Sequence, residues 1–198
     1  MIALEVTSIP GFAQAWHATI LDTAPLIAPA RQFVFPVNVP GEEEALARGA
    51  LWLQIRPEQG QMFLAQCALG FAGSGVATGV WPTPNPHHLL AVAGGYAYRI
   101  DTSAPEHTAL LPLKPVVAVR AAAAALVLVG FHALGIVTVH DTWQSPRISW
   151  EGITITAIDG QQVHGTGWDL RTDRELPFTL DLQTRRLSGG AYPAASAG

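Results

Sequence analysis

The sequence has little cysteine and little charge. Its 198 residues include one cysteine, Cys67, which cannot form an intramolecular disulfide or a cysteine-rich zinc site. Charged residues make up 13%, well below the roughly 25% that is usual for soluble domains. A single thiol suits a reducing compartment, and the first residues lack the basic and apolar regions of a secretory signal. We therefore expect a soluble cytoplasmic protein.

Basic residues are few and scattered. Eleven lysines and arginines stand against 15 aspartates and glutamates, which leaves a formal net charge of −4. The longest basic run is the pair Arg185 and Arg186. Because binding to nucleic-acid phosphates needs a clustered positive surface, the sequence predicts no nucleic-acid partner.

Complete catalytic signatures are also missing. The glycines of residues 73–79 are spaced loosely like a phosphate-binding loop, but three prolines in residues 80–86 exclude the helix that such a loop requires. Ser74 lacks the G-x-S-x-G frame of a serine hydrolase. Cys67 lies among apolar residues, where burial makes a thiol unreactive. We expect no cofactor, and a protein without enzymatic activity is favoured.

Apolar residues and turn residues are abundant instead. Hydrophobic residues make up 49% of the chain, and there are 19 glycines and 15 prolines. Most apolar runs after residue 50 are short, and Gly, Pro, Asp or Asn separates them. This pattern predicts an all-β fold of repeated antiparallel meanders, propeller-like or arranged as a sandwich or open barrel, with one or two short helices. The predicted strands are 2–6, 32–39, 51–56, 61–67, 89–93, 97–101, 115–120, 126–129, 136–140, 153–158, 162–165 and 177–182.

Two local features refine this prediction. Residues 41–48, GEEEALAR, are the best helix candidate, because glutamates open the segment, Arg48 closes it and Gly49 can cap its end. Asp159 and Gly160 predict a tight two-residue hairpin turn, since such turns need positive φ angles.

Residues 121–139 form a long apolar stretch that a hydropathy window would mark as a membrane span. It holds 19 residues, and His132 is its only ionisable group. Two glycines and several β-branched residues favour the alternative, two buried strands joined by a turn. We take this alternative and expect no membrane span.

Three segments, 89–102, 126–142 and 161–184, share an apolar strand, a turn and a second strand. The first two are about 35 to 40 residues apart, near the length of one propeller blade. Descent from one repeated unit and coincidence between unrelated hairpins both stay open.

Residues 89–192 contain AVAGGYAYRIDT, SWEGI, GTGWD, PFTLDLQT and SGGAY. With these segments the region resembles a family of uncharacterised bacterial proteins with propeller-like β-meander repeats. The resemblance implies repeated meanders and no activity. We expect one β-rich domain over residues 1–198, with an irregular part at 1–88 and a repeated part at 89–192.

The segment GTGWD has a folding role in this interpretation. Gly165 and Gly167 are expected in turn conformations, Trp168 over the edge of the core, and Asp169 as an acceptor of backbone N–H groups in the loop.

Two hypotheses about function follow. The first is a non-enzymatic domain that binds a protein partner or another copy of itself through loops and edge strands around Trp81, Trp143 and Arg147. Aromatic residues on a rigid β scaffold supply contact area, and unpaired strand edges invite pairing.

The second hypothesis is a small metal- or ligand-binding enzyme. Imidazoles and carboxylates gathered round one pocket could bind a metal or transfer protons. Their spacing matches no metal-binding motif, so we expect no metal site. The candidate residues are His132, His140, His164 and Asp169.

Overall fold

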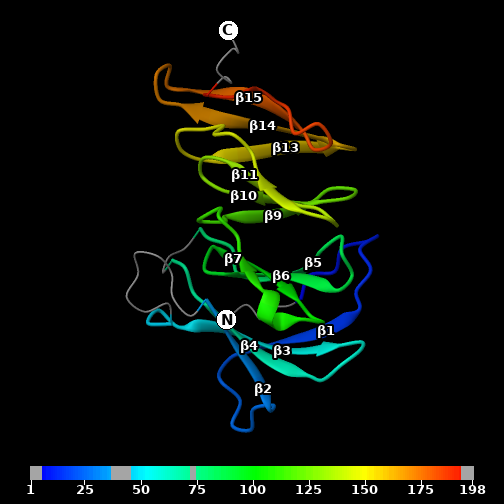
Figure 1. Ribbon diagram of the computed structural model, residues 1–198. Coiled ribbons are helices and arrows are strands. Elements are labelled where there is room, and N and C mark those ends of the chain that lie inside the picture. The colour runs from blue at the N-terminus through cyan, green and yellow to red at the C-terminus, as the bar shows by residue number, and fades with distance from the viewer. Residues whose placement is uncertain (1–5, 37–45, 72–74, 193–198) are drawn as a thin grey trace. The chain divides into compact units, whose positions relative to one another are not determined.

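The protein is described by a computed structural model, which covers residues 6–36, 46–71 and 75–192 (Figure 1). Within these ranges it is an all-β protein of four four-stranded sheets, with one 3-10 turn at Pro105–His107. The backbone divides into two compact units, residues 1–115 and 116–198, and each is described by itself. The predicted strand 2–6, apart from Val6, and the predicted helix 41–48, apart from its last three residues, lie outside the described residues.

The first sheet of unit 1 has the strand order β1-β3-β4-β2. Strands β1, β3 and β4 are antiparallel, whereas β2 lies parallel to β4 at the edge. The predicted strand 32–39 corresponds to β2, within the part of it that is described. The bounds of these strands are β1 Trp16–Leu21, β2 Arg31–Phe35, β3 Ala50–Pro57 and β4 Phe63–Ala68.

The other three sheets are antiparallel meanders in chain order, as in the four-stranded blade of a propeller. In unit 1 the strands are β5 Gly79–Pro82, β6 His88–Ala93, β7 Tyr96–Asp101 and β8 Ala109–Leu110. In unit 2 they are β9 Ala118–Ala121, β10 Leu126–Val129, β11 Leu134–Val137 and β12 Thr142–Gln144, followed by β13 Ile153–Asp159, β14 Gln162–Asp169, β15 Arg174–Asp181 and β16 Leu187–Gly189.

Each unit has its own apolar core between its two sheets. In unit 1, buried side chains of β3 and β4 pack with those of β6 and β7, and the Tyr98 hydroxyl donates a hydrogen bond of 2.8 Å to the Ala68 carbonyl. In unit 2, Val127 and Ile136 of one sheet pack with Phe178 and Leu180 of the other. The predicted all-β fold of meanders is confirmed, and the interpretation as one domain stays a prediction.

The three related segments occupy equivalent positions. Residues 89–102 contain most of β6 and β7, residues 126–142 contain β10 and β11, and residues 161–184 contain β14 and β15. Each pair forms the two middle strands of its meander. The resemblance between the segments therefore follows a recurring element of the structure.

The long apolar stretch folds as two strands. β10 and β11 pair antiparallel around the turn that holds His132, and all their residues are buried. Among the described residues, no helix has the length and apolar character needed to cross a membrane.

The predicted turn at GTGWD is wrong, because Gly165 and Gly167 lie inside β14. A Cβ atom on Gly165 would overlap the Thr154 carbonyl of β13 and lie 2.8 Å from the Phe178 ring of β15. A Cβ atom on Gly167 would lie 2.9 Å from the Ile148 carbonyl. These glycines permit close approach of neighbouring groups rather than a turn. The hairpin at residues 159–162 is confirmed, with Gly160 at a φ of 56°.

Aspartates organise the connections from third to fourth strands. The Asp181 carboxylate accepts hydrogen bonds from the N–H groups of Gln183 at 3.0 Å and Thr184 at 2.7 Å. Asp101 accepts two bonds from the backbone in the same way after β7. Such Asx turns hold the chain in the reversal that lets the fourth strand pair with the third.

An Asp181→Ala variant is expected to have a lower Tm than the wild type, because both backbone N–H groups lose their acceptor. Hydrogen bonds from Thr184 and Gln183 lower the pKa of Asp181 below its usual value. Its contribution to stability is therefore present above the unfolded-state pKa and is lost as the pH falls through the folded-state pKa. Asp181→Asn keeps an acceptor oxygen, so its Tm at pH 7 should fall less than that of Asp181→Ala. The Tm of Asp181→Asn should also depend less on acid pH than the Tm of the wild type. Thermal melts between pH 7 and pH 3 measure this, and identical acid dependence in wild type and Asp181→Asn would contradict it.

Candidate functional site

The candidate site is the edge of unit 2 that holds the fourth strands of its two sheets, β12 and β16, each of which ends the order of its sheet among the described strands. Three aromatic side chains gather here: Trp143 of β12, Trp150 after it, and Tyr192 after β16. Two arginines, Arg147 and Arg185, stack on their rings. We call these five residues the aromatic edge.

The first stack is centred on Arg147. Its guanidinium carbon lies 5.1 Å from the centre of the Trp150 ring and 4.7 Å from that of Tyr192. The two rings have centroids 4.8 Å apart and are tilted by 38°. The Arg147 Nε donates to the Ser149 carbonyl at 3.1 Å, which fixes the guanidinium plane. The chain after β12 is thus joined to the chain after β16 by cation–π contacts.

His132 adds a polar contact to this stack. Its Nδ1 lies 3.3 Å from the Arg147 Nη2 and 3.3 Å from the Ser149 carbonyl oxygen. The Nδ1 can accept from the Arg147 guanidinium or, when it carries a proton, donate to the Ser149 carbonyl, so it makes one of these two hydrogen bonds at a time. In the first arrangement His132 supports the position of Arg147.

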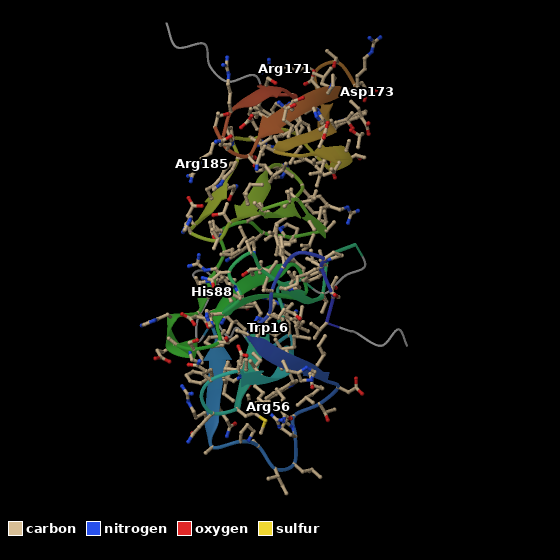
Figure 2. All side chains as sticks on the ribbon, turned by 90° about the vertical axis from the view of Figure 1, so that its right-hand side faces the viewer. Trp16, Arg56, His88, Arg171, Asp173 and Arg185 are labelled. Atoms are coloured by element: carbon tan, nitrogen blue, oxygen red, sulfur yellow. The ribbon has the colours of Figure 1, made fainter. Side chains whose placement is uncertain are left out.

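The second stack is centred on Arg185, in the turn between β15 and β16. Figure 2 shows this side chain at the surface of unit 2, where its exposed fraction is 52%. The guanidinium carbon lies 5.2 Å from the centre of the Trp143 ring and the group is ion-paired with Asp141. A hydrogen bond from the Thr138 hydroxyl, together with Arg185, lowers the pKa of Asp141 below its usual value.

The two stacks lie at the two ends of β16. Arg185 precedes this strand and contacts Trp143, whereas Tyr192 follows it and contacts Arg147. In the other strand, Trp143 lies within β12 and Arg147 follows it. The aromatic edge therefore runs along both fourth strands and bridges the two sheets of unit 2.

Buried polar atoms without a partner are concentrated here. Among the described residues, three buried side-chain polar atoms lack a hydrogen-bond partner, and all belong to the aromatic edge: Trp143 Nε1, Trp150 Nε1 and the Tyr192 hydroxyl. An unmatched buried polar atom usually costs about 1–3 kcal/mol, so such atoms are rare and often mark functional regions.

The predicted His and Asp cluster does not form one site. His132 precedes β11 and His140 follows it, so they lie at opposite ends of this strand. His164 and Asp169 lie on the same strand, β14, separated by about 16 Å at the usual rise per residue. Across the described ranges, no group of three or more His, Cys, Asp or Glu side chains could hold a metal ion.

The individual roles of these residues are local. The His164 Nδ1 lies 3.1 Å from the Thr179 hydroxyl, across the pair β14 and β15. Asp169 accepts hydrogen bonds from the Thr172 hydroxyl at 2.8 Å and the Arg171 N–H at 3.2 Å, as expected for an acceptor in the loop. These bonds lower the pKa of Asp169.

The predicted binding residues separate into two locations. Trp143 and Arg147 both belong to the aromatic edge. Trp81 lies in unit 1, on the edge strand β5, and its ring packs over Gly79. Sequence patterns did not indicate Arg185 or Tyr192, since only the fold brings them to Trp143 and Arg147.

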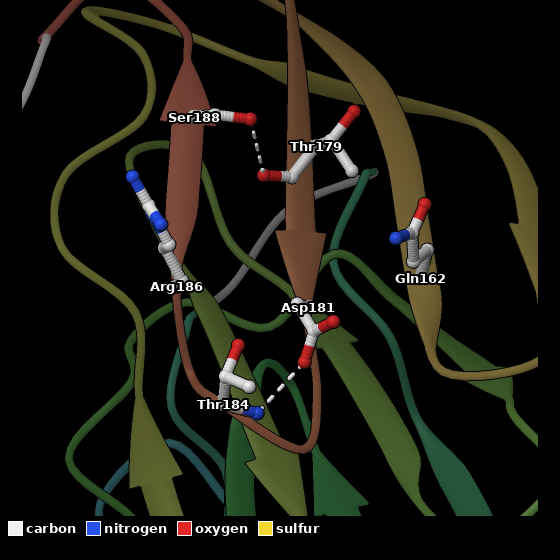
Figure 3. A pocket seen from close by; sticks show the side chains of 6 residues that line it. All are labelled: Gln162, Thr179, Asp181, Thr184, Arg186 and Ser188. Carbon is white, nitrogen blue, oxygen red and sulfur yellow. Dashed lines mark hydrogen bonds between the residues drawn. The ribbon is translucent and has the colours of Figure 1, made fainter.

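A polar depression of about 490 Å³ lies on the outer face of the last sheet (Figure 3). The Ser188 hydroxyl donates to the Thr179 carbonyl at 3.4 Å, and the Asp181 carboxylate is engaged in its turn. Polar residues are expected wherever one face of an antiparallel sheet meets water, so we regard the depression as a hydrated face. Its lining residues are Gln162, Thr179, Asp181, Thr184, Arg186 and Ser188.

Comparison with known proteins gives little further information. No family model matches the chain, and no curated protein matches it. One solved structure that it is similar to is the N-terminal domain of Nup159, with 8% sequence identity and a TM-score of 0.37. That match covers 97% of this chain and 55% of the Nup159 chain. A likeness this weak establishes neither a shared fold nor a shared function.

Proposed function

We propose that this protein is a non-enzymatic binding domain whose aromatic edge engages an extended segment of a partner protein. The observation that carries the proposal is that two arginine–aromatic stacks lie at the two ends of β16, and that the three unmatched buried polar atoms of the described residues all belong to the rings of these stacks. Tryptophan, tyrosine and arginine are the residue types most enriched at the centres of protein interfaces.

The strand edges supply the second part of this surface. Within the described part of the chain, β12 and β16 each pair with one neighbour only, so alternate backbone N–H and C=O groups point away from the sheet. An extended peptide can pair with such an edge while its side chains contact the flanking aromatic rings. Binding that shifts a tryptophan or the tyrosine would also provide partners for their unmatched polar atoms.

The alternative of a metal- or ligand-binding enzyme is not favoured, because the residues it needs lie apart on β14 and at the two ends of β11. Membership of a bacterial family with propeller-like repeats and a cytoplasmic location remain part of the proposal. The meander sheets are consistent with such a family, and the single buried thiol is consistent with a cytoplasmic location.

A random-peptide display library panned against the whole protein tests the proposed function. Enriched peptides should bind Arg147→Ala at least roughly tenfold more weakly than wild type, as for the loss of a hot-spot residue. Arg147→Lys should bind nearly as weakly, because an ammonium cannot stack as a planar guanidinium does. Arg174→Ala, which removes an exposed arginine at the start of β15, is the matched control and should bind normally.

Hydrogen exchange locates the bound peptide. The proposal requires slower exchange of the amides of β12 and β16 when peptide is present. Failure to enrich any peptide, equal binding by Arg147→Ala, or protection confined to other strands would each contradict the proposed function.

A further inference from the structure

The two stacks of the aromatic edge differ in one respect, which is the presence of a carboxylate. Arg185 lies on the Trp143 ring and is also ion-paired with Asp141 of its own chain. Arg147 lies on two rings, but no carboxylate of the described residues is within ion-pairing distance of its guanidinium. The stack of Arg147 therefore repeats the stack of Arg185 without its anion.

The polar groups of the Arg147 stack are donors that lack acceptors. The Arg147 Nε and Nη2 donate to the carbonyls of Ser149 and Trp150 at 3.1 and 3.4 Å, whereas Nη1 has no partner among the described residues. The Trp150 Nε1 and the Tyr192 hydroxyl also have no partner within these residues. A guanidinium and an indole N–H only donate, and a hydroxyl can donate as well. The missing group is therefore an acceptor, and beside a guanidinium a negatively charged acceptor binds most strongly.

The two acidic residues nearest to Arg147 in the sequence, Asp141 and Glu151, do not supply this acceptor. Asp141 accepts from the Thr138 hydroxyl and pairs with Arg185 in the other stack. Glu151 lines a separate depression, whose lining does not include Arg147. A negatively charged partner for Arg147 therefore has to come from a bound molecule.

We propose that the partner segment bound by the aromatic edge carries an aspartate or glutamate whose carboxylate pairs with Arg147, an inference that rests on the proposed function and specifies its partner. One guanidinium beside neutral donors matches a single carboxylate. A phosphoryl group carries up to about two charges and is normally bound by a cluster of arginines, whereas Arg185 already has a counter-ion. The net charge of −4 also disfavours a polyanion.

The acidic residue should lie near one end of the bound segment. The Arg147 stack is at the end of β16 that Tyr192 follows, and the Arg185 stack is at the end that Arg185 precedes. Asp141 occupies the Arg185 stack, so a second carboxylate there would meet a like charge. A segment paired along β16 therefore places its carboxylate near one terminus and a residue without negative charge near the other.

A double-mutant cycle with the peptides selected against the whole protein tests the pairing. These peptides should share an acidic residue near one end, and its replacement by the matching amide should weaken binding to wild type about tenfold, as for loss of a charge-assisted hydrogen bond. The same replacement should leave the weak binding of Arg147→Ala unchanged, because the group that the carboxylate pairs with is already absent. With the control Arg174→Ala, the replacement should weaken binding as much as with wild type.

Peptides without a shared acidic residue, or an amide replacement that leaves binding to wild type unchanged, would overturn this inference and leave the proposed function standing. A small probe covers the opposite case, in which no peptide is enriched and the proposed function fails. Titration with N-acetylglutamic acid α-methylamide should shift the Nε–Hε NMR signal of Arg147 saturably, and the glutamine analogue should not. The signal is assigned by its loss in Arg147→Lys. Equal shifts at Arg147 and Arg174 would show that the stack does not select a carboxylate and would overturn the inference as well.

Discussion

A Gly165→Ala variant should lose about 1–3 kcal/mol of stability or more, as expected for overpacking at a site without room. The added methyl group would overlap the Thr154 carbonyl of β13 and press on the Phe178 ring of β15. The carbonyl belongs to the paired backbone of a neighbouring strand, so relief requires β13 and β14 to separate. Phe178 is 3% exposed and packs in the core of unit 2, so its ring has little freedom to move.

Hydrogen exchange of the native protein measures this effect where it arises. The amides of β13, β14 and β15 should exchange faster in Gly165→Ala, since exchange in paired strands follows the free energy of opening. Thr166→Ala is the control: this neighbouring side chain faces outward and hydrogen-bonds the exposed Glu175. It should change stability only slightly, because exposed polar contacts contribute little. Equal protection in wild type and Gly165→Ala would show that β14 can accept a Cβ atom here.

Gly165 also shows where sequence patterns reach their limit. The glycines of GTGWD predict a turn, because glycine freely adopts positive φ angles. In the structure Gly165 is a strand residue, and what matters is the missing Cβ atom between two neighbouring strands. The same residue type serves both needs, and only the packed neighbours distinguish them.

Strands with their own apolar pattern could be predicted, whereas strands defined by their neighbours could not. β10 is found at its predicted bounds, and most of the other predicted strands differ only at their ends, because buried β-branched runs favour extended backbone. β8 and β16 contain only two and three residues, and pairing with the third strand of each meander defines them. The parallel position of β2 beside β4 depends on a long-range pairing that no local pattern reports.

Only part of the candidate site could be selected from the sequence, because some of its residues come together only through long-range packing. Trp143 and Arg147 could be selected as aromatic and cationic residues near strand ends. Arg185 and Tyr192 come from the far end of the second sheet, so their contacts arise only when both sheets pack. The histidines were grouped because each lies near a predicted strand end. That pattern does not specify at which end of a sheet a residue lies, and the structure has His132 and His140 at opposite ends of β11.

Cys67 is expected to be almost unreactive toward a thiol reagent in the native protein. Its side chain is fully buried in β4, between the paired strands β3 and β2. Burial raises the pKa of this thiol well above its usual value, because the charged thiolate loses its hydration. A reagent reaches the sulfur only when the middle of the sheet opens. For a domain of ordinary stability this slows labelling by roughly 10³-fold or more.

The reaction with DTNB at pH 8, followed with and without denaturant, measures this protection. Unfolded protein should release one equivalent of thionitrobenzoate at once, and native protein should release it slowly, at a rate that rises with denaturant. Rapid stoichiometric labelling of the native protein would place the thiol at an accessible edge and contradict the core of unit 1.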